Sequence, residues 1–138
     1  MARVSGGELA GAVAAAGGLG MIGVGGATEL DFIAREGALA KGRGRFGVGL
    51  MCWALEGRPE LLDAVLETGP NVVSLSFGDP APWVDRVRSA GARVVSQVQD
   101  SASAREALDA GVDAIAGFTM PAPAPPNRKP ASSVVQLE

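Results

Sequence analysis

Short apolar runs alternate with segments of helical spacing over residues 71–116. The apolar runs are rich in valine, and they begin at Val72, Val94 and Ala114, with turn residues on either side of each. Two parallel strands of one sheet must be joined by a crossover of a dozen or more residues, and this spacing leaves room for one. The pattern therefore predicts successive βαβ units in a parallel sheet.

The two intervening segments carry signals for helix ends. We expect Asp79 to cap one helix, with Pro80 at its first position, where the missing N–H costs nothing. The next helix is expected to start near Ser101 or Ser103, because Ser103 and Glu106 have the spacing of a capping box. A glycine follows each helix, as the left-handed position after a helix end favours.

The same order of helix, glycine and strand recurs upstream. One helix is expected over Glu8–Ala16, with Ser5 and Glu8 as a capping box; a second is capped by Thr28, and a third spans Pro59–Thr68. With the downstream units this gives five predicted strands, which are Leu19–Val24, Phe46–Met51, Val72–Phe77, Val94–Gln99 and Ala114–Ala116.

Polar side chains occur on two of these strands. The third strand has an apolar face made of Val73, Leu75 and Phe77, whereas Ser74 and Ser76 lie on its other face. In the fourth strand the polar residues, Gln97 among them, gather at the carboxyl end. Parallel α/β sheets bind ligands beyond the carboxyl ends of their strands, so these side chains are candidates for a site. The alternative is a glutamine that forms its hydrogen bonds within the protein.

Composition narrows the function classes. The chain has 138 residues and a net charge of −3, without a basic cluster, so we expect one domain and no nucleic-acid surface. Cys52 is the only cysteine, which excludes an internal disulfide and favours a reducing, cytoplasmic location. We interpret Cys52 as an apolar filler. The sequence has no histidine, the commonest general base and metal ligand, and we expect no metal site.

Two segments resemble motifs that their context argues against. Gly18–Gly23 matches the dinucleotide fingerprint G-x-G-x-x-G, but it follows a helix and forms the predicted strand itself. The uncharged stretch from Leu9 to Ala27 contains seven glycines, which argues against a membrane span or an export signal. We therefore expect neither nucleotide binding by this motif nor membrane insertion.

The carboxyl-terminal residues differ in character from the rest. Residues 117–138 have no periodicity and are rich in proline, which is typical of a disordered tail or a polyproline linker. We therefore divide the chain into an α/β domain over residues 1–116 and a tail over 117–138.

Five segments together resemble one enzyme family. They are Val4–Ala10, Ala16–Gly23, Phe46–Leu50, Ser76–Pro80 and Ala90–Val98. In this order they are similar to the amino-terminal part of the nitronate monooxygenases, formerly called 2-nitropropane dioxygenases. The resemblance covers residues 1–116.

The resemblance implies a TIM barrel that binds FMN and oxidises alkyl nitronates with O₂. Flavin-dependent enoyl-thioester reductases share this fold and much of the pattern. By position, Met1 and Ala2 match the turn beneath the flavin, although Arg3 stands where the family has glycine. Gly49 and Met51 match the strand that lines the flavin, and Gln97 matches a polar residue that hydrogen-bonds to it. Such a group near the isoalloxazine tunes its electronics.

The sequence departs from the family after Ala116. The family continues into a glycine-rich turn with a catalytic histidine, whereas this chain continues with the proline-rich segment, so no catalytic residue is assigned. A TIM barrel needs eight βα units, and five cannot close one. We expect an incomplete barrel that is prone to self-association through its open sheet edges. The alternatives are a non-catalytic half-barrel that binds or associates, a part of an enoyl-thioester reductase, and a flavodoxin-like open sheet.

Overall fold

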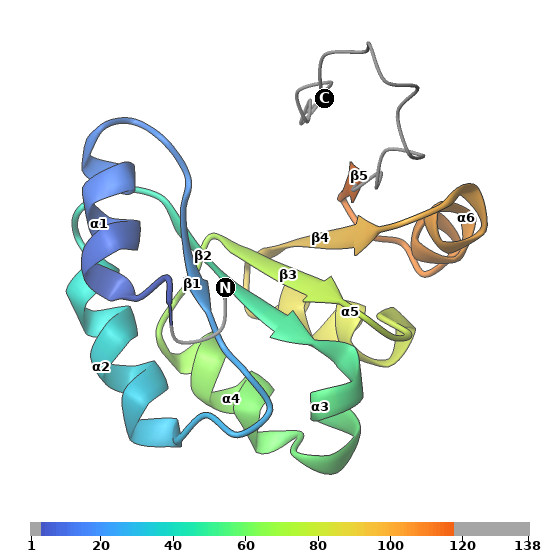
Figure 1. The fold of residues 1–138 in the computed structure, drawn as a ribbon, viewed down its shortest axis with the longest axis horizontal. Coiled ribbons are helices and arrows are strands. Elements are labelled where there is room, and N and C mark those ends of the chain that lie inside the picture. The colour runs from blue at the N-terminus through green and yellow to red at the C-terminus, as the bar shows by residue number, and fades with distance from the viewer. Residues whose placement is uncertain (1–3, 118–138) are drawn as a thin grey trace, which may run out of the picture.

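The structure is a computed structural model that describes residues 4–117. Five parallel strands form one sheet in the order β1-β2-β3-β4-β5, and each strand pairs with the next along the chain (Figure 1). This confirms the predicted parallel order. The strands span Gly20–Gly23 (β1), Phe46–Met51 (β2), Val72–Ser76 (β3), Arg93–Val98 (β4) and Ala114–Gly117 (β5).

Helices connect the strands, as the sequence pattern predicts. They span Gly7–Ala15 (α1), Leu30–Ala40 (α2), Cys52–Gly57 (α3), Glu60–Glu67 (α4), Ala81–Ser89 (α5) and Ser101–Asp109 (α6). The short helix α3 was not expected, since its six residues offer too little periodicity to detect. It follows β2 directly, so the chain turns from strand to helix at Cys52 without a loop.

The hydrophobic core lies between the sheet and the helices. Alternate residues of the central strands, such as Val73 and Leu75, are fully buried there, and Leu61 and Leu62 of α4 and Val87 of α5 pack in the same cluster. Burial of such a side chain stabilises a fold by roughly 1.5–3 kcal/mol. The other residues of each strand point to the opposite face of the sheet, because successive side chains alternate, and that face remains available for a site.

Three of the predicted helix caps are wrong, because the expected side chains have other partners. Ser5 donates its hydroxyl hydrogen bond to the carbonyl of Met21, and α1 has no side-chain cap. The hydroxyl of Thr28 accepts from the N–H of Gly25 at 2.9 Å, within its own loop, and α2 likewise has none. Both side chains thus hold loops rather than helix ends.

The third wrong cap is at α6, where Asp100 replaces Ser103. The Asp100 carboxylate accepts from the N–H of Ser103 at 2.8 Å and from its hydroxyl at 2.9 Å. The helix α5 begins at Ala81, and Asp79 accepts from the Ala81 N–H at 2.9 Å. Pro80 is therefore the residue before the helix and not its first, although Asp79 still satisfies a free amide.

Phe77 does not continue the apolar face of β3, in contrast to the prediction. The strand ends at Ser76, and Phe77 has a φ of 60° and a side chain that is 52% exposed. A left-handed conformation is uncommon for a residue with a large side chain. It turns the aromatic ring out of the core, towards the carboxyl ends of the strands.

Each outer strand of the sheet has one paired neighbour among residues 4–117. β1 pairs with β2 and β5 pairs with β4, and no further strand flanks either in the part of the chain described. Ser5 bonds to the outer edge of β1, at the N–H of Gly23 and the carbonyl of Met21. No helix within that part is long and apolar enough to cross a membrane. Gly117, the first residue of the predicted tail, belongs to β5, whereas residues 118–138 and the predicted site residues Met1 and Ala2 lie outside the described residues.

Candidate functional site

Residues without bulky side chains form a row across three neighbouring strands. The register places Gly23 of β1 beside Gly49 of β2, and Gly49 beside Ser74 of β3. In the next row, Met51 lies beside Ser76. These residues lie on the face of the sheet opposite the core, near the carboxyl ends of its strands. The backbone here can be approached closely by a flat ligand, because no side chain larger than serine stands in the first row.

A cavity of about 310 Å³ lies over this row. Three of the residues proposed for cofactor binding, Gly49, Met51 and Gln97, line it together, although they come from two different strands. Its size is at the lower end of the range for small-molecule sites. The remaining lining residues are Gly23, Val24, Leu50, Ser74, Ser76 and Phe77.

The strands β3 and β4 separate at the mouth of this cavity. Their backbone pairing runs from Val72 to Ser74 and stops there. Beyond it, the hydroxyl of Ser76 accepts a hydrogen bond from the backbone N–H of Gln97 at 3.2 Å, and lies 3.2 Å from the hydroxyl of Ser74. A serine side chain thus replaces a backbone carbonyl as the partner of Gln97, which fixes the position of that residue.

The side chain of Gln97 is half-buried and forms no hydrogen bond with the described residues. Its amide offers an oxygen acceptor and two N–H donors. Because the residue is half-buried and lines the cavity, this amide can form hydrogen bonds with water or with a ligand there. The sequence left two interpretations of Gln97 open, which are a ligand contact and hydrogen bonds within the protein. The described residues provide no internal partner for its side chain.

The turn after β3 is held by contacts that the sequence did not predict. The carbonyl of Phe77 accepts from the N–H of Trp53 at 3.3 Å. At Gly78, which has a φ of 140°, an added Cβ would lie 2.9 Å from the Cβ of Cys52, so glycine is required. Strained residues of this kind cluster at functional sites. In the sequence, the signal for this turn is the pair Phe77-Gly78, which comes directly after a buried strand.

Cys52 does not take part in the chemistry of the site. Its side chain is buried, as expected for an apolar filler, and burial raises the pKa of its thiol to about 11, with Asp79 adding to the shift. A thiol with such a pKa is protonated at neutral pH and is a poor nucleophile. Among residues 4–117, no three His, Cys, Asp or Glu side chains are grouped to hold a metal ion.

Solved structures of enzymes match this chain in fold and sequence. FabK from Thermotoga maritima aligns with a TM-score of 0.72 and 29% identity, over 83% of this chain and 37% of FabK. Its M276A mutant aligns with a TM-score of 0.73 at the same identity, over 39% of that chain. Nitroalkane oxidase from Streptomyces ansochromogenes gives 0.66 and 28% identity, over 81% of this chain and 42% of the oxidase. No protein-family model and no curated protein matches the sequence.

The fold and these matches define a class: the chain is a partial TIM barrel, similar in fold to part of two enzymes. FabK and nitroalkane oxidase both fall in the nitronate monooxygenase family, so the resemblance of this chain to that family is confirmed. The chain spans about two fifths of the length of the solved chains, 37% to 42%.

Proposed function

We propose that the cavity over Gly49 and Gln97 forms one wall of an FMN site, in a barrel that oxidises alkyl nitronates with O₂. The observation that carries this proposal is the free amide of Gln97 beside a row of Gly and Ser residues, in a chain that aligns with nitroalkane oxidase. Bound FMN would supply the redox chemistry, by taking electrons from the nitronate and passing them to O₂.

The described residues fit a flavin ring. The row Gly23, Gly49 and Ser74 leaves a shallow surface on which a planar group can lie against the backbone. Gln97 is held by Ser76 at the rim, where its amide can donate to or accept from a ring heteroatom. Met1 and Ala2, which the resemblance assigns to the same site, extend the proposal to residues beyond those described.

This chain would bind and orient the ring and would not supply the base. The sequence contains no histidine, and a base that takes the substrate proton contributes roughly 10² to 10⁴ in rate. We therefore propose that residues 1–116 contribute part of a barrel, with 117–138 as a separate tail. The lone buried cysteine supports a reducing, cytoplasmic location.

A second candidate function is that of a flavin-dependent enoyl-thioester reductase, which the alignment with FabK favours equally well. The sheet edges at β1 and β5 favour a third, in which the half-barrel is a non-catalytic module that associates with another chain. Flavin binding separates the first two candidates from the third, and substrate tests then separate the first two.

The test is a titration of the purified chain with FMN, followed by the quenching of flavin fluorescence. We expect saturable binding that Gln97→Ala weakens about threefold to tenfold, as the loss of one hydrogen bond implies. The matched control is Gln99→Ala, because Gln99 is exposed and does not line this cavity. No saturable binding, or equal affinity for both variants, would overturn the proposal.

Turnover is tested separately by oxygen consumption with an alkyl nitronate and added FMN. We expect the chain alone to give no rate above that of free FMN, since it carries no histidine. A faster rate that falls with Gln97→Ala would show that this chain contains a base of another kind. An enoyl thioester and a reduced nicotinamide, tested in the same way, address the second candidate.

A further inference from the structure

Two exposed aromatic residues lie at the carboxyl-end edge of the sheet. Trp53, the second residue after β2, is 55% exposed, and Phe77, the first residue after β3, is 52% exposed. Their backbones are joined, because the N–H of Trp53 donates to the carbonyl of Phe77 at 3.3 Å. We call these two residues the aromatic surface. Tryptophan and phenylalanine are enriched where a protein binds another chain segment, so this surface is a candidate interaction site.

The Trp53 ring is held in place although it is exposed. A Cβ added at Gly26, in the loop after β1, would lie 2.9 Å from this ring, so the ring packs against the loop backbone. Arg58 holds the same loop by donating to the carbonyls of Gly26 and Thr28 at 2.9 and 3.0 Å. A side chain that is already fixed loses little conformational entropy when it binds a partner.

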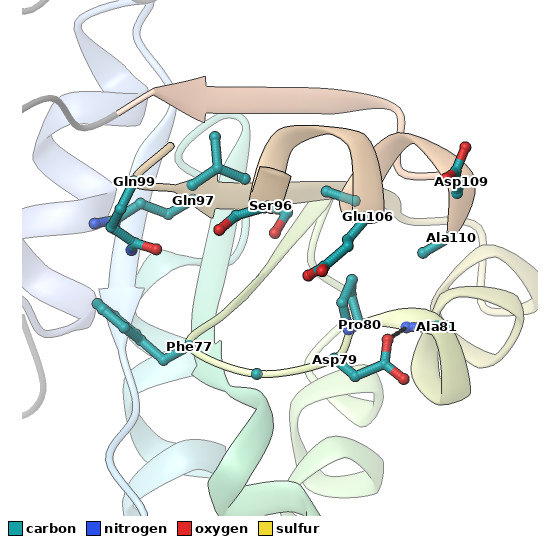
Figure 2. Close-up of a pocket in the computed structure, with 14 residues that line it drawn as sticks. Phe77, Asp79, Pro80, Ala81, Ser96, Gln97, Gln99, Glu106, Asp109 and Ala110 are labelled. Carbon is teal, nitrogen blue, oxygen red and sulfur yellow. Dashed lines mark hydrogen bonds between the residues drawn. The ribbon is translucent and has the colours of Figure 1, made fainter. Parts of the chain in front are cut away.

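Apolar and amide groups continue the aromatic surface towards β4. Phe77 lines a cavity of about 670 Å³ together with Gln97 and Gln99, between the loop after β3, the end of β4 and α6 (Figure 2). Pro80 and Val98 add apolar groups to the lining of this cavity. Such a surface suits a partner that presents apolar rings together with backbone carbonyls.

The chain itself carries a segment of that kind shortly after β5. Four of the six residues 121–126 are proline, and the other two are alanine. This composition favours the polyproline II conformation, which has no internal hydrogen bonds and is recognised by aromatic-lined surfaces. The indole N–H of Trp53 and the side-chain amide of Gln97 have no hydrogen-bond partner among the described residues. Both groups can therefore donate to the carbonyls of such a segment.

The geometry of the sheet brings this segment within reach of the aromatic surface. β5 ends at Gly117 and runs parallel to its neighbours, so the chain leaves the sheet at the edge where Phe77 and Trp53 lie. In the sheet order β5 is three positions from β2, which is about 14 Å at the usual strand spacing. Residues 118–126 span about 28 Å in the polyproline II conformation. The segment is therefore long enough to cross β4 and β3 and to reach Trp53.

Charge favours the same path. Arg128 and Lys129 follow the prolines, so in a chain that runs from β5 towards β2 they would lie beyond Trp53, at α3. Glu56 is three residues after Trp53 in α3, and residues with this spacing share one side of a helix. The Glu56 side chain is exposed and forms no ion pair within residues 4–117. The path thus brings two cations to an unpaired carboxylate.

We propose that the aromatic surface is the docking site of the chain's own residues 121–126, with the two basic residues that follow them beside Glu56. This inference goes beyond the proposed flavin site and does not rest on it. Phe77 also lines the cavity over Gly49, so the docked segment would lie at the rim of that cavity.

The test uses the full chain without flavin and carries a nitroxide label on Ala131→Cys, two residues after the basic pair. The label broadens NMR signals near it, and this effect falls steeply with distance. We expect strong broadening of the Trp53 indole N–H and of the Glu56 amide. The amides of Asn71 and Arg93, at the amino ends of β3 and β4, should broaden much less. The parent, treated with the same reagent, reports any reaction at the native cysteine.

Two pairs of variants localise the docking. Phe77→Leu keeps an apolar side chain without the aromatic ring and should reduce the broadening at Trp53 about threefold, as the loss of an aromatic contact implies. Its control is Trp83→Leu on α5, which removes a half-buried ring that lines neither cavity. Glu56→Gln should also reduce the broadening, whereas Glu67→Gln, at an exposed position on α4, should not.

Equal broadening in Phe77→Leu and Trp83→Leu, or broadening spread evenly over the chain, would overturn the proposal. A labelled chain is also mixed with an unlabelled, isotope-enriched one. Broadening that occurs only between chains would assign the surface to a second copy and would also overturn it. Docking in a chain that fails to bind FMN would support this inference while removing the proposed flavin function, and FMN binding without docking would do the reverse.

Discussion

The hydroxyl of Ser76 accepts a hydrogen bond from the backbone N–H of Gln97 at 3.2 Å, at the point where β3 and β4 stop pairing. This contact links the end of one strand to Gln97, and both residues line the cavity over Gly49. It holds Gln97 through its backbone, while the side-chain amide of Gln97 has no hydrogen-bond partner among the described residues.

We expect Ser76→Ala to weaken FMN binding about threefold, because Gln97 loses an anchor while keeping its amide. Ser76→Thr keeps the hydroxyl and should restore most of the affinity. The measurement is the FMN titration, with thermal melting as a check of stability. If Ser76→Ala and Ser76→Thr bind FMN as the parent does, Ser76 has no positioning role.

The strands and their order could be predicted from the sequence. Runs such as Phe46–Met51 are short, apolar and bounded by turn residues, and the spacing between runs leaves room for a helix. The resemblance also identified Gly49, Met51 and Gln97 before the structure brought them to one cavity. Their common location follows from the parallel order, because the carboxyl ends of parallel strands meet at one edge.

The helix caps and the turn after β3 could not be predicted. Ser5, Thr28 and Ser103 have capping spacing, but Ser5 bonds to Met21, distant in sequence, and the other two bond to residues three positions earlier, Gly25 and Asp100. Phe77 continues the alternation of β3 in the sequence, yet it is left-handed and its side chain is exposed. Spacing and alternation alone do not identify these partners or this turn.

We expect Phe77→Gly to be more stable than Phe77→Ala by about 1 kcal/mol. Glycine normally destabilises relative to alanine by roughly 0.5–1 kcal/mol, but a left-handed conformation costs a residue with a Cβ about 1–2 kcal/mol. The φ of 60° should therefore reverse the usual order. Urea unfolding of the two variants measures the difference. Alanine as the more stable of the two would mean that the turn is not strained.

Asp113, directly before β5, hydrogen-bonds to the backbone of β4. We expect Asp113→Asn to destabilise the fold by about 1 kcal/mol at neutral pH. The carboxylate accepts from the Val94 N–H at 2.7 Å and pairs with Arg88 at 2.9 Å, and the Val94 bond is the larger cause of its lowered pKa. Urea unfolding at neutral pH measures the effect. Asp85→Asn, at an exposed position on α5, is the control.

The pH dependence of that effect has a defined sign. The pKa of Asp113 is lower in the folded chain than the unfolded value of 3.8, so its contribution is present above that value. It is lost as the pH falls through the lowered pKa. The difference between the parent and Asp113→Asn should therefore shrink in strong acid. A difference that stays constant with pH would show that packing, and not charge, is responsible.

We expect the Cys52 thiol to resist labelling by a disulfide reagent at neutral pH until the chain unfolds. Burial raises its pKa from 9.0 to about 11, so the folded state holds the proton more tightly than the unfolded state. Stability should consequently fall as the pH rises above 9, and Cys52→Ala should lack this fall. Rapid labelling in the absence of denaturant would contradict the buried position.

The open edge at β1 leads to an expected self-association. The neighbouring helix α1 exposes Leu9 and Val13, with 56% and 40% of their surface accessible, and an apolar surface beside an edge strand favours association. We expect the mass of the parent, measured by light scattering, to rise with concentration. Leu9→Glu should reduce this rise, because a charge buried at a contact is costly.

The control is Leu30→Glu on α2, which changes a leucine that is 39% exposed. A parent chain that stays monomeric at all concentrations would exclude association through this edge, and equal effects of the two variants would place the contact elsewhere.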